Sequence, residues 1–180
     1  MFNDELHYQI LVLKCQRQDN SAFKEMVNLW EPRLYYYLRR LVGNESFICD
    51  ILQETWIAVF SNINKLKNVR KFPAWLYRIA HCKAIEWLRA ENKYVLMSDE
   101  QIVKYCENNI TITFVNEQVE LVHELLEKLN LVYREVLTLY FLEDFSINEM
   151  AEIIGIPEGT VKSRLHYAKN ALREMLGGIK

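Results

Sequence analysis

The sequence predicts an all-α protein made of two small helical domains joined by a linker. Only five glycines and three prolines interrupt its 180 residues, and long stretches repeat apolar residues at spacings of three and four, which is the helical period. With 51% hydrophobic and 26% charged residues, the chain can fill one core of moderate size or two small cores. The C-terminal domain is expected to be a helix-turn-helix.

Four helices are expected in the first part of the chain. The second follows a capping cluster of Asp19, Asn20 and Ser21, and it stops at Gly43 and Asn44, because such side chains start helices and a glycine ends them. The expected ranges are residues 4–18, 22–41, 45–63 and 72–91.

A change of composition separates this block from the next. Residues 93–116 mix β-branched, acidic and amide side chains without a helical period, which predicts a partly extended linker. A short pair of strands inside one domain is the alternative. The expected domains are therefore residues 1–92 and 117–180, and the second should hold helices over residues 117–129, 131–142, 146–154 and 158–176.

The end of the chain has the pattern of a helix-turn-helix. Ser146 and Glu149 match the capping box, in which a hydroxyl and a carboxylate satisfy exposed backbone donors at a helix start. That helix is expected to end at Gly155, and Pro157 lies where a second helix can begin. Two helices joined by so short a turn are what the motif requires.

Two side-chain stripes run along the expected last helix. The apolar stripe must face the core and consists of Val161, Leu165, Ala168, Leu172 and Met175. The second stripe is basic, and it is either a solvent-exposed face or a surface that binds DNA. The capped turn before it favours DNA binding. Residues near the start of such a helix reach base edges, whereas later ones hold phosphates. The base-edge candidates are Lys162, Ser163 and His166; the phosphate candidates are Lys169, Arg173 and Arg164, the last of which alternatively packs its stem.

The expected helix over residues 45–63 also has two faces. Its core stripe consists of Ile48, Leu52, Trp56 and Val59. The opposite side carries Asp50, Gln53, Glu54 and Ile57. An isoleucine exposed on a polar face indicates a partner surface, and an ordinary solvated face is the alternative.

A basic segment, residues 65–71, precedes the fourth expected helix. On that helix Phe72, Trp75, Leu76 and Ile79 are expected to face the core. Arg78, Ile85 and Arg89 form a separate stripe, which Tyr77 and His81 flank. Basic side chains beside aromatic ones on a loop and a helix are typical of proteins that bind single-stranded nucleic acid.

The net charge of −2 conceals two local basic surfaces. Residues 65–93 carry 8 basic and 2 acidic side chains, and residues 157–180 carry 5 and 2. Residues 117–180 as a whole still have a net charge of −4. Phosphates can therefore be held locally, but no global field attracts nucleic acid.

Three segments resemble the sigma factor family of bacterial RNA polymerase, and specifically its small extracytoplasmic-function (ECF) group. Residues 50–56, DILQETW, look like the family's D-x-x-Q-E-[TA]-aromatic segment. Residues 72–80 look like its promoter-melting helix, and residues 155–166 look like its fourth-region recognition helix. The matches extend over residues 22–176, nearly the whole chain.

The resemblance implies a subunit that binds core RNA polymerase and directs promoter-specific initiation. The group implies polymerase contacts at Asp50, Gln53, Glu54 and Ile57. It implies capture and opening of the −10 element by Lys67, Asn68, Arg70, Lys71, Tyr77, Arg78, His81 and Arg89. It implies reading of the −35 element by Lys162, Ser163, Arg164, His166, Lys169 and Arg173. An anti-sigma factor clamped between the domains is a further implied partner.

The chain also departs from the family pattern. His81 and Cys82 replace a usual Arg-Asn pair, and Glu86 replaces an aspartate. Asn68 and Val69 replace a Gly-Glu pair, and Tyr167 stands where arginine is common. The promoter sequence is therefore left open.

Two other classes of function are compatible with parts of this sequence. A helix-turn-helix regulator explains residues 146–176 equally well, but it gives the DILQETW segment no role. A helical enzyme is disfavoured because no phosphate loop or nucleophile motif occurs, and the histidines lack partners at ligand spacing. No catalytic residue, metal or cofactor is therefore expected.

The spacing of the cysteines and the composition of the N-terminus indicate the cellular compartment of the protein. The cysteines at positions 15, 49, 82 and 106 form no C-x-x-C pair and are expected to be reduced structural thiols. The N-terminus lacks a basic start and a long apolar run, so we expect a cytoplasmic protein without stable membrane insertion.

Overall fold

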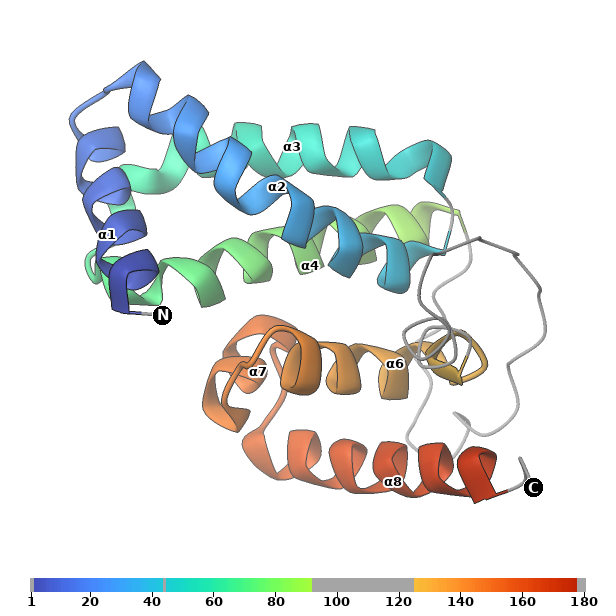
Figure 1. The fold of residues 1–180 in the computed structure, drawn as a ribbon. Helices are drawn as coiled ribbons and strands as arrows, with labels where there is room; N and C mark the ends of the chain where they lie inside the picture. Colours follow the sequence, from blue (N-terminus) through green and yellow to red (C-terminus); the bar gives the residue numbers. More distant parts are fainter. Residues whose placement is uncertain (1, 44, 92–124, 178–180) are drawn as a thin grey trace. The chain divides into compact units, whose positions relative to one another are not determined.

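The computed structural model of the protein describes residues 2–43, 45–91 and 125–177. The chain divides into two compact units, one holding α1 to α4 and the other holding α6, α8 and most of α7. Every regular element within the described ranges is helical (Figure 1). The prediction of an all-α protein with two helical domains is confirmed.

In its described residues, the first unit contains four α-helices and three short 3₁₀ turns. They are α1 (Phe2–Gln16), α2 (Asn20–Val42), η1 (Glu45–Phe47), α3 (Ile48–Asn62), η2 (Ile63–Lys65), η3 (Val69–Lys71) and α4 (Phe72–Ala90). The expected helix over residues 45–63 is therefore α-helical only in its middle, because its first and last turns tighten to 3₁₀ geometry.

The limits of α2 follow from the capping signals in the sequence. The Asp19 carboxylate accepts hydrogen bonds from the backbone N–H of Ser21 at 2.9 Å and of Ala22 at 3.1 Å. These bonds, with one from the Ser21 hydroxyl as the largest contribution, lower the pKa of Asp19. At the other end Gly43 adopts a left-handed φ of 69° and donates to the Arg39 carbonyl. Without a Cβ, glycine adopts this conformation at little cost.

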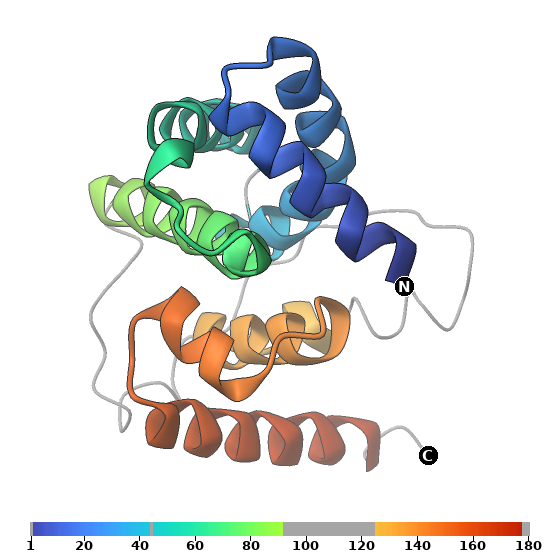
Figure 2. The same cartoon turned by 90° about the vertical axis from the view of Figure 1, so that its left-hand side faces the viewer.

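Fully buried side chains from α2, α3 and α4 fill the core of the first unit. Leu34 and Leu38 of α2, Val59 of α3 and Leu76 of α4 are each completely buried. Each such side chain contributes about 1.5–3 kcal/mol through removal from water. Helix α1 lies across one end of the other three (Figures 1 and 2) and adds Leu11 and Val12 to the core.

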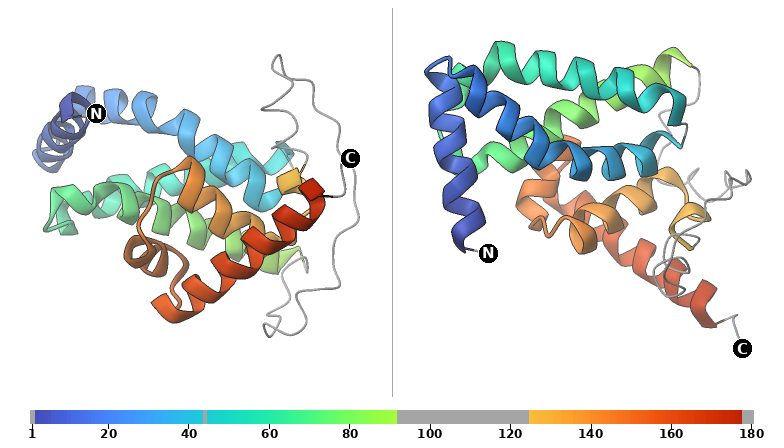
Figure 3. Two further views of the ribbon diagram at one scale, coloured as in Figure 1. Left: turned by 60° about the horizontal axis from the view of Figure 1, so that its bottom comes forward. Right: turned by 45° about the horizontal axis from the view of Figure 1, so that its top comes forward.

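The second unit contains the helix-turn-helix. Its described elements are α6 (Leu131–Leu137), η5 (Thr138–Leu142), α7 (Ile147–Ile154) and α8 (Glu158–Gly177), which Figure 3 shows from two sides. The expected α-helix over residues 131–142 is only partly right, because η5 is a π-helix in which Glu143 donates to the Thr138 carbonyl five residues earlier. The expected helix over residues 117–129 lies largely outside the described residues; its residues 125–127 are helical.

The capped turn of the motif has the predicted geometry. Ser146 and Glu149 form both hydrogen bonds of the capping box at the start of α7. Gly155 ends α7 with a left-handed φ of 80° and donates to the Ala151 carbonyl. On α8 the first three residues of the predicted apolar stripe, Val161, Leu165 and Ala168, are buried, and Leu172 and Met175 are half-buried.

Two cysteines of the first unit are expected to differ sharply in reactivity. Burial, with the nearby Asp19 carboxylate as the second cause, raises the pKa of Cys15 to about 11, whereas Cys49 lies exposed on α3. Because the thiolate is the reactive form, iodoacetamide at about pH 8.5 should alkylate Cys49 and spare Cys15. Peptide mass mapping will measure both sites. Equal labelling in the folded protein would contradict this packing, and labelling of both after denaturation is the control.

Candidate functional site

One face of α3 is polar and exposed, as the sequence predicts. Asp50, Gln53 and Glu54 are exposed, and the Ile57 side chain is 58% accessible beside them. The opposite face carries the buried Ile48, Leu52, Trp56 and Val59. Since the core fixes the rotation of the helix, this acidic face with an exposed isoleucine is presented rigidly.

Glu54 on this face is joined to α4 by an ion pair. The Lys83 ammonium lies 3.3 Å from a Glu54 carboxylate oxygen and 3.0 Å from a Glu86 carboxylate oxygen. The hydrogen bond to Glu86 is the largest cause of a raised pKa at Lys83; partial burial opposes it and Glu54 adds to it. Lys83 therefore stays protonated and partly neutralises the C-terminal side of the acidic face.

The basic loop between α3 and α4 is ordered by local hydrogen bonds. The Asn68 side chain accepts from the Arg70 backbone N–H at 3.1 Å, and the Lys71 N–H donates to the Asn68 carbonyl at 3.0 Å. Lys67, Asn68, Arg70 and Lys71 are all exposed. The loop residues that the sequence predicts to bind the −10 element thus lie together in the segment from η2 to η3.

The expectation for Tyr77 and His81 is wrong. Both are expected from the sequence to flank the stripe of Arg78, Ile85 and Arg89 and to contact DNA, but both are buried. The Tyr37 ring of α2 lies 5.1 Å from that of Tyr77, and its hydroxyl oxygen lies 3.4 Å from Nδ1 of His81. These two side chains therefore belong to the packing between α2 and α4, and a contact with DNA is not among the roles that this geometry supports.

The residues of the stripe on α4 itself differ in their exposure to solvent. Ile85 is buried, Arg78 is half-buried and Arg89 is exposed. Among the four residues expected to face the core, Phe72 and Leu76 are buried, and Trp75 and Ile79 are half-buried. Of the candidate DNA contacts on α4, Arg89 is thus the most accessible.

The start of α8 presents a compact polar surface. Lys162, Ser163 and His166 are all exposed within its first three turns. The Ser163 hydroxyl donates to the Gly159 carbonyl at 3.1 Å, which leaves its oxygen lone pairs directed outward as acceptors. Nε2 of His166 lies 3.1 Å from Nδ2 of Asn170, and Asn170 in turn accepts from Arg173 at 3.3 Å.

Lys169 is placed differently from the other bases of α8. Its ammonium lies 4.6 Å from the centre of the Tyr140 ring and 5.2 Å from that of Phe141, which is within the range of a cation–π contact. Lys169 and Arg164 are half-buried. Lys169 therefore anchors α8 to η5, and it extends less toward a ligand than Lys162 does.

Several residues that organise these surfaces were not found from the sequence. Gln16 and Lys83 bind partners on other elements, and Tyr37 buries His81. Each contact joins residues far apart along the chain, so no local spacing signals it. The Lys169 contact with Tyr140 depends on the π-helix, which the apolar periodicity does not predict.

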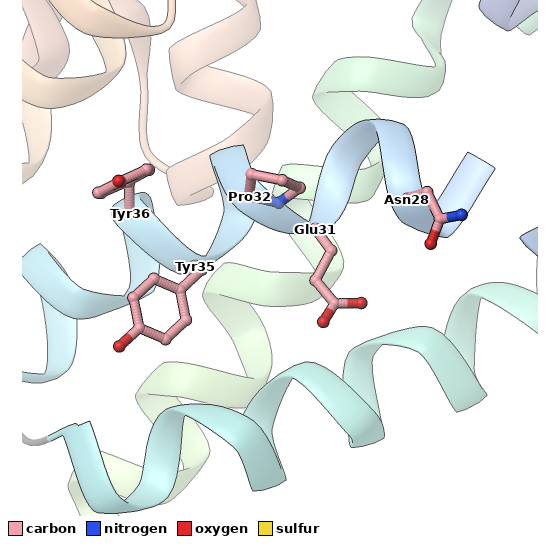
Figure 4. A pocket seen from close by; sticks show the side chains of 5 residues that line it. All are labelled: Asn28, Glu31, Pro32, Tyr35 and Tyr36. Atoms are coloured by element: carbon pink, nitrogen blue, oxygen red, sulfur yellow. The ribbon is translucent and has the colours of Figure 1, made fainter. Parts of the chain in front are cut away.

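One further surface depression lies on α2. Figure 4 shows the side chains that line it, Asn28, Glu31, Pro32, Tyr35 and Tyr36, arranged along the helix. Over the described ranges, no three metal-ligating side chains cluster together. The helices within those ranges are also too short or too polar to traverse a bilayer.

Comparison with known proteins identifies both units. Residues 26–94 match the family model "Sigma-70 region 2", and residues 120–172 match "Sigma-70, region 4". The chain is 30% identical to the ECF RNA polymerase sigma factor SigW of Bacillus subtilis, over 92% of this chain and 94% of SigW. It is 27% identical to the ECF RNA polymerase sigma-E factor of Escherichia coli K12, over 94% of each.

Solved structures share the fold. The structure of CnrH in complex with the cytosolic domain of CnrY matches with a TM-score of 0.69 and 22% identity, over 97% of this chain and 99% of CnrH. The sigma factor RpoE of Bartonella quintana, solved with the anti-sigma factor NepR, matches with a TM-score of 0.67 and 23% identity, over 88% of this chain and 98% of RpoE.

These matches leave no need for an autonomous regulator or an enzyme to explain the two units. They place both units within one family. The chain belongs to the ECF group of RNA polymerase sigma factors, and it is therefore a non-enzymatic protein that directs promoter-specific initiation of transcription.

Proposed function

We propose that the surfaces described above divide the work of initiation among them. The acidic face of α3 docks on core RNA polymerase, the basic loop and α4 open the −10 element, and the start of α8 reads the −35 element as duplex. The observation that carries this proposal is that one acidic and two basic groups of side chains lie exposed on separate elements. We assign the first two roles to residues 1–92, the last to residues 117–180, and a connecting role to residues 93–116.

The docking surface on α3 consists of Asp50, Gln53, Glu54 and Ile57. Its carboxylates suit a basic partner, and Ile57 supplies an apolar contact among them. The resemblance of residues 50–56 to the family's polymerase-binding segment points to the coiled coil of the largest polymerase subunit. Gln53 offers both a donor and an acceptor between the two charged groups.

The opening surface consists of Lys67, Asn68, Arg70, Lys71 and Arg89, with Arg78 beside them. The basic side chains attract the DNA backbone, and the turn around Asn68 offers amide and carbonyl groups to an extruded base. Extrusion costs a few kcal/mol, which contacts in the loop must offset. Tyr77 and His81 contribute through the packing that holds α4 and not through direct contact.

The duplex-reading surface is the start of α8. Lys162, Ser163 and His166 are the base-edge contacts of a helix-turn-helix, and Arg173 reaches the phosphate backbone. Lys169 and Arg164 contribute mainly through support of the helix.

The two structural relatives above were solved with CnrY and with the anti-sigma factor NepR. We propose an anti-sigma partner for this chain too. We also propose a cytoplasmic location.

The docking assignment predicts a loss of polymerase binding without loss of structure. Asp50→Ala combined with Glu54→Ala should weaken binding of core polymerase by about 2–5 kcal/mol, because charge-assisted contacts with a basic partner disappear. Fluorescence anisotropy with labelled protein measures the affinity, and circular dichroism measures the helical content. Glu31→Ala combined with Glu127→Ala removes two exposed carboxylates elsewhere and should leave the affinity unchanged. Equal losses in both pairs would refute the assignment.

Reading and opening should be separable by mutation. Lys162→Ala and Ser163→Ala should each weaken recognition of the −35 duplex by about 1–3 kcal/mol. Changes at Asn68, Arg70 or Lys71 should leave duplex recognition intact and reduce open-complex formation. Permanganate footprinting of the holoenzyme at the promoter reports the second property. If both sets of variants impaired both steps equally, the division of labour would be wrong.

The free protein should bind promoter DNA weakly. Lys162 and Arg173 attract phosphate, but residues 117–180 have a net charge of −4, and repulsion from these acids acts over about 8 Å at physiological salt. We expect a Kd near the non-specific range of roughly 10⁻⁴ to 10⁻⁶ M at about 150 mM salt. Polymerase should raise the affinity by orders of magnitude, because it makes the second contact effectively intramolecular. Nanomolar, sequence-specific binding in a gel shift without polymerase would contradict this account.

A further inference from the structure

Gln16, at the C-terminal end of α1, binds the chain just before the basic loop. Its side-chain Nε2 donates one hydrogen bond to the Ile63 carbonyl at 3.0 Å and another to the Leu66 carbonyl at 2.8 Å. Both N–H groups of one amide are thereby used across 47 and 50 residues of sequence. The amide is partly buried, so water competes for these bonds less than it would on an open surface.

Helix α1 also contacts the residue at which the loop ends. The Tyr8 ring lies 6.4 Å from the ring of Phe72, the first residue of α4, and 5.6 Å from that of Trp30 on α2. Phe72 is completely buried. The two ends of the loop are therefore held on one helix, at Gln16 and at Tyr8, and Figures 1 and 2 show α1 alongside the connection between α3 and α4.

The middle of the loop is fixed by contacts of another kind. Between Leu66 and Phe72, the hydrogen bonds made by the backbone of the loop are local ones to Asn68 and Val69, which shape η3. Lys67, Arg70 and Lys71 extend outward from this turn. Local bonds thus shape the turn, and the contacts of Gln16 and Phe72 hold its two ends.

We propose that Gln16 is a positioning residue for promoter opening. It holds the start of the basic loop so that Lys67, Asn68 and Arg70 are preorganised for the extruded base, although α1 itself carries none of the assigned DNA contacts. A loop that is already ordered loses less conformational entropy when it captures the base. The inference rests on the proposed role of the loop in opening the −10 element.

Gln16→Glu and Gln16→Met test the inference. Glutamate keeps the size of the side chain but places a carboxylate against two carbonyl oxygens, and methionine removes the donors without adding charge. Gln18→Glu makes the same charge change two residues along, at an exposed position, and is the matched control. Circular dichroism and thermal unfolding verify that each full-length variant folds.

The first measurement concerns the loop alone. Trypsin cleavage after Lys65, Lys67, Arg70 and Lys71, followed by mass spectrometry, reports how often the loop opens. Loss of two hydrogen bonds should accelerate this cleavage about tenfold in both Gln16 variants and not in Gln18→Glu. Unchanged cleavage in Gln16→Met, the variant without an added charge, would overturn the inference and would leave the proposed function unaffected.

The second measurement uses the holoenzyme. With core polymerase, both Gln16 variants should form open complexes about tenfold more slowly, while polymerase affinity and recognition of the −35 duplex stay at the level of the Gln18→Glu control. An equal fall in polymerase affinity would show a general effect of α1 and would overturn the inference. Faster cleavage with normal opening would also overturn the inference, and the role of the loop itself would be refuted only if changes at Asn68, Arg70 or Lys71 left opening normal too.

Discussion

Each helix in this protein must bury one apolar stripe, and this constraint decides which side chains remain for partners. On α3 the buried Ile48, Leu52 and Val59 fix the rotation of the helix, so Asp50 and Gln53 are directed outward. On α8 the buried Val161 performs the same task and Lys162 is its exposed neighbour. Burial therefore supplies the rigidity that recognition needs, since a surface held by a packed core does not have to be ordered again on binding.

Features that depend on local sequence were predicted well. The limits of α2 follow from Asp19 and Gly43, and the helix-turn-helix follows from Ser146, Glu149 and Gly155, because capping and left-handed turns involve residues only a few positions apart. The exposed face of α3 was predicted for the same reason, since the spacing of apolar residues within one helix shows which of its faces is buried.

Features that depend on contacts between distant elements were not predicted. Tyr77 and His81 flank a partly basic stripe in the sequence, but Tyr37 of α2 packs against both, and they are buried. The bonds from Gln16 to the loop and from Lys83 to Glu54 likewise join separate helices. A helical wheel shows which residues share a face of one helix. It does not show how much of that helix a neighbouring helix covers.

The π-helix at Thr138–Leu142 has a consequence for how this unit tolerates change in length. A turn with one extra residue rotates everything beyond it by about 100° relative to a continuous α-helix. The Tyr140 and Phe141 rings that receive the Lys169 ammonium lie within this turn. Deletion of one residue there would restore regular α-helical winding, and it would displace the two aromatic rings that contact Lys169 of α8. The irregularity thus supports α8 through Lys169, and a single-residue deletion would weaken that support.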